Sequence, residues 1–144
     1  MKVIATLFIL LLPALKSPAV QPDTQRVLNA WITMQNNGSD KAVRQFIDSY
    51  YSPDMLSKMK NYDSHVAFYK QIIQEFGKVQ STVYLTETDS EHKLKVQLIK
   101  EGRALVPEPS PEEILVVEID LDPENPKYLS RGLGLGALIC YIKR

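Results

Sequence analysis

The chain has 144 residues, of which 44% are hydrophobic and 24% charged, and its 17 basic and 17 acidic residues cancel. This length suits one small domain with a modest core, and the composition is that of an ordinary globular protein. Charge balance excludes the broad positive field of a nucleic-acid binder and any strong attraction to anionic membranes. The expected partners are therefore proteins or neutral small molecules, and no nucleic acid.

The N-terminus has the features of an export signal. A positive start is followed by the apolar run Val3–Leu12, which is too short to span a bilayer comfortably. Small residues at Ser17 and Ala19 predict cleavage after Ala19, so residues 1–19 are a signal peptide and residues 20–144 form a single domain. An uncleaved membrane anchor is the alternative. We expect an exported protein, periplasmic or extracellular, with no stable membrane insertion after cleavage.

Three helices are predicted after the signal, because apolar residues recur every three or four positions in each of them. Glycines and capping residues set their limits, which are residues 24–35, residues 40–51 after a cap at Ser39 or Asp40, and residues 64–76 after a start near Asp63 or Ser64. Their apolar stripes consist of Val27, Leu28, Trp31 and Met34, then Val43, Phe46, Ile47 and Tyr50, then Val66, Tyr69, Ile73 and Phe76.

The hydrophobic period then changes to two, which predicts strands with one solvated face. Four strands are expected, at residues 79–86, 93–98, 117–121 and 128–142. No helical pattern falls between them, so the sheet should be antiparallel, with a proline-rich loop at 102–112 and a tighter turn at 122–126. The predicted fold class is α+β, with two to three N-terminal helices packed on a curved four-stranded antiparallel sheet.

Several stretches carry a resemblance to a known family. They are residues 37–46, 51–56, 72–77 and 118–134. This pattern, over residues 24–136, resembles the NTF2-like (SnoaL/cystatin-like cone) modules found N-terminal to serine hydrolases and S41-type peptidases in exported bacterial proteins. The resemblance implies a non-catalytic binding or accessory module for a protein, such as a hydrolase, or for a small apolar ligand. The sequence stops at Arg144, before the catalytic domain that usually follows.

The residues that could take part in catalysis or metal binding do not form a recognisable catalytic set. His65 and His92 have no acidic or cysteine cluster around them in sequence, so no metal site is expected. Cys140 is the only cysteine, which rules out an internal disulfide, and it lies in an apolar stretch expected to be a core strand. The glycines of residues 131–136 lack the ending of a phosphate-binding loop, and their alternation leaves one strand face without side chains.

A row of acidic residues follows one strand parity. It consists of Glu118, Asp120, Asp122 and Glu124. Such a row could gather a cation, but a solvated strand face is the favoured interpretation.

Aromatic residues of the helices are the candidate ligand-binding residues. These are Trp31, Tyr50, Tyr69 and Phe76, which could line a pocket between helices and sheet or simply pack in the core. No catalytic residue and no cofactor is assigned. The alternative function is a small cone-pocket enzyme of isomerase or hydrolase type, which requires a carboxylate or histidine pointing inward. A homodimer formed through the open sheet is a further possibility.

Overall fold

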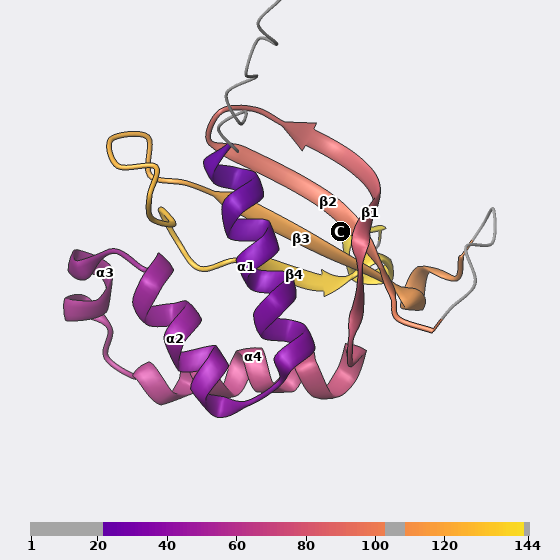
Figure 1. Cartoon of the computed structure of the whole chain (residues 1–144), viewed down its shortest axis with the longest axis horizontal. Helices are drawn as coiled ribbons and strands as arrows, with labels where there is room; N and C mark the ends of the chain where they lie inside the picture. Colours follow the sequence, from indigo (N-terminus) through magenta and orange to yellow (C-terminus); the bar gives the residue numbers. More distant parts are fainter. Residues whose placement is uncertain (1–21, 103–108, 143–144) are drawn as a thin grey trace, which may run out of the picture.

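The computed structural model describes residues 22–102 and 109–142. The predicted signal peptide and residues 103–108 of the predicted loop lie outside the described residues. The elements are α1 (Asp23–Asn37), α2 (Asp40–Tyr50), α3 (Pro53–Lys58), α4 (Tyr62–Phe76), β1 (Val79–Asp89), β2 (Lys93–Lys100), η1 (Pro111–Glu113), β3 (Ile114–Asp120), β4 (Gly134–Ala137) and α5 (Leu138–Ile142). Helices α1 to α4 precede the sheet, so the predicted α+β class is confirmed (Figure 1). Within the described ranges, no helix is long and apolar enough to cross a membrane.

The three predicted helices are present as α1, α2 and α4, and capping residues mark where they begin or end. Gly38 ends α1 with a φ of 72°, a left-handed conformation that glycine adopts without strain. Ser39 caps α2, because its side chain accepts a hydrogen bond from the N–H of Ala42 at 3.2 Å. Asn61 caps α4 in the same way, so this helix already begins at Tyr62.

Helix α3 is an element that the hydrophobic pattern did not predict. The Ser52 side chain accepts a hydrogen bond from the N–H of Met55 at 3.1 Å, and Pro53 occupies the first helical position. Proline is tolerated there because its missing N–H would have had no partner within the helix. The Ser52-Pro53 pair therefore ends the pattern of α2, as predicted, and also begins the next helix.

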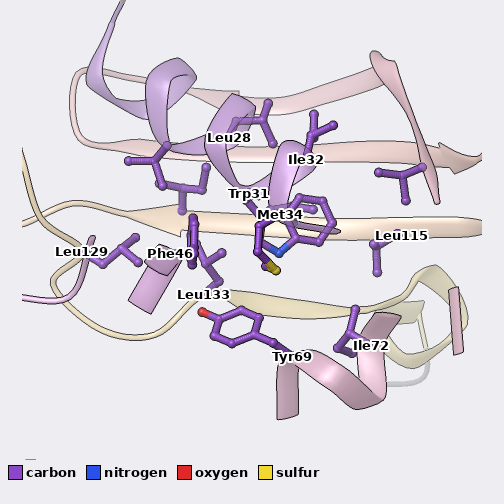
Figure 2. Packing of buried hydrophobic residues seen from close by; sticks show 14 of the residues in the cluster. Leu28, Trp31, Ile32, Met34, Phe46, Tyr69, Ile72, Leu115, Leu129 and Leu133 are labelled. Atoms are coloured by element: carbon purple, nitrogen blue, oxygen red, sulfur yellow. The ribbon is translucent and has the colours of Figure 1, made fainter. Parts of the chain in front are cut away.

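The four strands form one antiparallel sheet in the order β1-β2-β3-β4. The sheet is curved, and α1, α2 and α4 lie on the same side of it (Figure 1). Alternate residues of the two central strands face these helices, as the period of two predicted. Figure 2 shows part of this core, in which the indole of Trp31 lies between α1 and the sheet. The strand residues in the core are Leu94, Val96, Leu98, Leu115, Val117 and Ile119.

Two predictions in the helices and strands need correction. In α4, Ile72 is buried, whereas the predicted Ile73 is only partly buried. The strand predicted over residues 128–142 is reduced to β4, and α5 follows it, with Cys140 exposed instead of in the core. Residues 137–142 are apolar without strict alternation with polar residues, and such a run does not distinguish a strand from a short helix.

The sheet face opposite the core, here called the outer face, has two different halves. Gln97, Ile99, Ile114 and Val116 are buried in one half, where α5 contacts β3, β4 and η1. The other half carries charged side chains. The apolar residues of the first half are covered by the chain itself, whereas Leu85, which pairs with the outer-face residue Gln97, is 48% exposed. A homodimer formed through the sheet therefore stays a prediction.

The glycines of β4 confirm the prediction that one strand face lacks side chains. Gly134 pairs with Glu118 and Gly136 pairs with Val116, so both glycines lie on the outer face. A Cβ atom at Gly134 would lie 3.0 Å from the Cβ and 2.9 Å from the Oε2 of Glu118. The Glu118 side chain therefore takes the space that a residue larger than glycine would need.

Gly134→Ala is expected to lower the free energy of unfolding by about 1–3 kcal/mol, because the new methyl group forces β3 and β4 apart at this pair. Urea denaturation of both proteins measures the change. The same substitution in a Glu118→Gly background is the matched control, since that background lacks the Cβ and the carboxylate that the new methyl group would meet. A Gly134→Ala protein as stable as the parent would contradict the close packing of Glu118.

Candidate functional site

The structure places the four predicted ligand-binding residues in different surroundings. Trp31 and Phe76 are buried in the core, and the Trp31 Nε1 atom has no hydrogen-bond partner among the described residues. Tyr50 is half-buried and lines a cavity between α1 and α2, whereas Tyr69 lines a cavity beside α4. The ring of Phe46 contacts both tyrosines, with centroid distances of 5.0 Å to Tyr50 and 5.7 Å to Tyr69. The four residues therefore do not line one common pocket, and a ligand-binding role for them stays a prediction.

The cavity on the outer face is lined in part by charged groups, four of which pair with one another. Lys95 Nζ lies 3.0 Å from Glu87 and 3.4 Å from Glu118, and Arg131 lies 3.5 Å from Asp120. A hydrogen bond from Gln97 and the nearby Lys95 ammonium lower the pKa of Glu87. This pairing indicates a structural network in a solvated face, which is the interpretation that the sequence favoured for these acids.

The predicted acidic row is only half formed. Glu118 and Asp120 lie on β3, but Asp122 lies beyond the strand end, where its carboxylate accepts hydrogen bonds from the N–H groups of Glu124 and Asn125. The predicted 122–126 turn is thus present. Because of this turn, Asp122 does not continue the row that Glu118 and Asp120 form on β3. Among the described residues, no group of three or more His, Cys, Asp or Glu side chains could hold a metal ion.

A different cleft brings together residues from the segment after α2, from α3 and α4, and from the segment before β4. It consists of two cavities, of about 320 Å³ and about 410 Å³, that share His65 as a lining residue. We call them the α4-side cavity and the α3-side cavity, and together the His65 cleft. The α4-side cavity is lined by Tyr51, Ser64, His65, Phe68, Tyr69, Gly132 and Leu133. The α3-side cavity includes Met55, Lys58, Met59, His65, Asp122 and Leu129.

The spacing of α4 residues explains how this helix builds one wall. Residues three and four positions apart lie on the same side of a helix, so His65, Phe68 and Tyr69 form one group. Phe68 is 40% exposed although it is a large apolar side chain, and Tyr69 is only 1% exposed. The wall therefore offers an accessible aromatic ring beside a buried phenol.

The opposite wall is held by backbone hydrogen bonds. The N–H of Leu129 donates to the carbonyl of Tyr50 at 2.8 Å, and Tyr51 and Leu129 form an isolated parallel bridge. Ser130 N–H donates to the carbonyl of Asp120 at 2.9 Å. These bonds fix the segment before β4 against the end of α2, next to α4.

A chain of polar side chains crosses the bottom of the cleft. The hydroxyl oxygens of Tyr51 and Tyr69 are 3.1 Å apart, and the Tyr51 hydroxyl is 3.4 Å from Nδ1 of His65. The Tyr51 and His65 rings meet edge to face at 5.7 Å. Gly132 allows this arrangement, because a Cβ atom there would lie 3.3 Å from the Tyr51 hydroxyl.

Burial keeps both phenols in their protonated form. Desolvation raises the pKa of Tyr51, and it raises the pKa of Tyr69 well above the usual value, with a further contribution from the neighbouring Tyr51. A hydrogen bond with the Leu133 backbone acts in the opposite direction on Tyr69. In Figure 2, the hydroxyl end of Tyr69 is directed towards Leu133. Both tyrosines therefore act as hydrogen-bonding hydroxyls and not as phenolates.

Sequence reasoning considered His65 as a metal ligand, and a histidine as the inward-facing group of a cone enzyme, but it did not identify Phe68 or connect Gly132 with His65. The steps of three and four residues from His65 to Phe68 and Tyr69 were a usable signal. The approach of Tyr51 and Gly132 was not, because it depends on chain segments that are distant in sequence.

No protein-family model, curated protein or solved structure matches the chain.

The raised pKa of the tyrosines predicts how stability changes in alkali. A tyrosine whose folded pKa exceeds its ordinary value of 10.0 keeps its proton more firmly in the folded state. This contribution is complete below about pH 10 and is lost as the pH rises through the folded values. We expect the urea midpoint to fall as the pH rises above about 10, and to fall less in Tyr51→Phe. An equal fall in both proteins would contradict the contribution of Tyr51.

Proposed function

We propose that the chain is an exported, non-catalytic NTF2-like module that binds a protein partner, such as a hydrolase, or a small apolar ligand at the His65 cleft. Three features support this proposal. The N-terminal 19 residues have the pattern of an export signal, the helices precede a curved antiparallel sheet, and the described chain forms a cleft next to α4.

The exposed ring of Phe68 is the observation that carries the proposal. The other large apolar residues of α4 are buried or partly buried, whereas Phe68 opens into a cavity beside polar hydrogen-bonding groups. Ligand sites in proteins usually combine apolar walls with a few well-placed polar atoms. Phe68 and Leu133 provide apolar surface here, and His65 and Ser64 provide polar atoms.

The polar residues of the core favour binding over catalysis. Apart from the buried phenols of Tyr51 and Tyr69, the buried polar side chains of the described residues are Thr24 and Gln35 on the core side and Gln97 on the outer face. Acid–base catalysis in an apolar cone needs a carboxylate or histidine aimed into it. None of these three residues can take up or release a proton near neutral pH.

A small enzyme of isomerase or hydrolase type is the second candidate, and His65 favours it. An imidazole within 3.4 Å of a buried tyrosine hydroxyl supplies a base next to a hydrogen-bond donor. If this were the function, His65→Gln would abolish turnover of a cleft-bound molecule while its binding remained. In a binding module, the same substitution changes affinity and no chemical conversion of the bound molecule is seen in either protein.

Site-specific photocrosslinking tests the proposed binding site. The residue benzoylphenylalanine would replace Phe68 in the full chain, in cells that export it, and replace Leu85 in a parallel control. Leu85 is 48% exposed and lies on β1, outside the His65 cleft. We expect a discrete adduct from position 68 at a clearly higher yield than from position 85, because an exposed apolar side chain at a binding site lies in contact with the bound molecule. Equal yields at the two positions would refute the His65 cleft as the binding site.

Processing of the exported chain tests the remaining part of the proposal. Cell fractionation followed by N-terminal sequencing should place the protein outside the cytoplasm, with a new N-terminus near Val20. The double variant Lys2→Glu/Leu10→Arg should stay unprocessed, because an export signal needs a positive start and an apolar run. Recovery of the uncleaved protein in the cytoplasm would exclude export.

A further inference from the structure

The polar chain at the bottom of the His65 cleft ends at His65. The hydroxyl oxygens of Tyr69 and Tyr51 are 3.1 Å apart, and the Tyr51 hydroxyl lies 3.4 Å from Nδ1 of His65. A tyrosine hydroxyl can either donate a hydrogen bond to a histidine ring nitrogen or accept one from it.

When Tyr51 donates this bond, His65 keeps a hydrogen-bond donor for a ligand. If Nδ1 of the neutral ring accepts a bond, the proton is on Nε2. Nε2 of His65 has no hydrogen-bond partner among the described residues. It is not one of their buried polar atoms without a partner, so it is accessible. His65 lines both cavities, so a ligand that occupies both passes its ring. A ligand that crosses this point needs an acceptor such as a carbonyl oxygen.

The two cavities differ in charge. The α4-side cavity has the exposed ring of Phe68 and contains no acidic or basic lining residue apart from His65. In the α3-side cavity, Lys58 lies 2.8 Å from Asp54 and neutralises it. Asp122 makes no ion pair among the described residues, and two backbone N–H groups hold its carboxylate in place. The α3-side cavity therefore has an uncompensated negative charge above the apolar side chains of Met55 and Met59.

We propose that the His65 cleft binds an extended peptide segment in which an apolar side chain occupies the α4-side cavity and a neighbouring basic side chain occupies the α3-side cavity. A backbone carbonyl between them accepts the hydrogen bond from Nε2 of His65. The two thioethers of Met55 and Met59 contact the methylene groups of the basic side chain, and Asp122 pairs with its charge. This inference rests on the proposed function and specifies the chemistry of the partner.

Blocked dipeptides are suitable probes, and the ¹H–¹⁵N NMR spectrum of the chain from residue 20 reports their binding. Acetyl-Phe-Lys-amide and acetyl-Lys-Phe-amide cover both chain directions, acetyl-Phe-Glu-amide reverses the charge, and acetyl-Ala-Lys-amide lacks the ring. At about pH 8, where imidazole is neutral, we expect millimolar dissociation constants. One of the lysine peptides should bind about threefold or more tightly than the glutamate peptide. The affected amides should include those of Phe68 and Leu133.

Matched variants assign each part of the peptide to its cavity. Asp122→Asn keeps the carbonyl oxygen that accepts the turn hydrogen bonds, and should abolish the preference for lysine over glutamate. Glu124→Gln removes a charge from the same turn outside the cleft and should leave the preference unchanged. Phe68→Ala should reduce the affinity for the phenylalanine peptides to that for acetyl-Ala-Lys-amide, whereas Leu85→Ala should not.

The outcomes separate this inference from the proposed function. Equal binding of the lysine and glutamate peptides, shifts confined to residues outside the cleft, or no shifts at about 20 mM peptide would overturn the inference. A crosslink at position 68 to a small molecule would also overturn it, but would leave the proposed function standing. Selective dipeptide binding without any crosslink at position 68 would support the peptide site and refute its use in the exporting cell.

Discussion

The contact between the hydroxyl groups of Tyr51 and Tyr69 is the interaction on which the site depends. Tyr51 follows the last residue of α2, and Tyr69 lies in the middle of α4. Both phenols are almost fully buried, so each hydroxyl needs a partner, and an unpartnered one would cost about 1–3 kcal/mol. The 3.1 Å contact satisfies both groups and fixes the position of α4 relative to the end of α2.

Other parts of the cleft follow from this contact. The backbone bridge between Tyr51 and Leu129 brings the segment before β4 to the same place, and Gly132 lets that segment lie close to the Tyr51 hydroxyl. His65 and Phe68 lie beside this contact because they are four residues and one residue before Tyr69 on α4, on the same side of the helix. The cleft is therefore a consequence of how α2, α4 and residues 129–133 meet, and no single element contains it.

The sequence was a good guide where one chemical rule acts over a short range. Gly38, Ser39 and Gly77 set helix ends as predicted, and the alternation in β2 and β3 identified the core side of the sheet. Prediction failed where competing structures share a pattern. The apolar run through Cys140 suits a strand or a helix, and only packing against the outer face decides between them.

The candidate site was less predictable for a related reason. Tyr69 was identified from its helical stripe, but its hydroxyl partner Tyr51 comes from another element, 18 residues earlier. Asp122 was placed in a strand row by parity, whereas the strand ends at Asp120 and the turn redirects the carboxylate. Periodicity specifies the face of one element, while a cleft depends on which faces of several elements meet.

The wall of the cleft formed by residues 121–130 has its shape from main-chain bonds. Leu121, Asp122, Leu129 and Ser130 all donate their N–H groups to backbone carbonyls. Apart from Asp122, whose carboxylate accepts hydrogen bonds from the turn, side chains in this wall can consequently change during evolution without altering its course. A family built on this scaffold could exchange one recognised ligand for another through a few surface substitutions, so its members would share a shape more than a specificity.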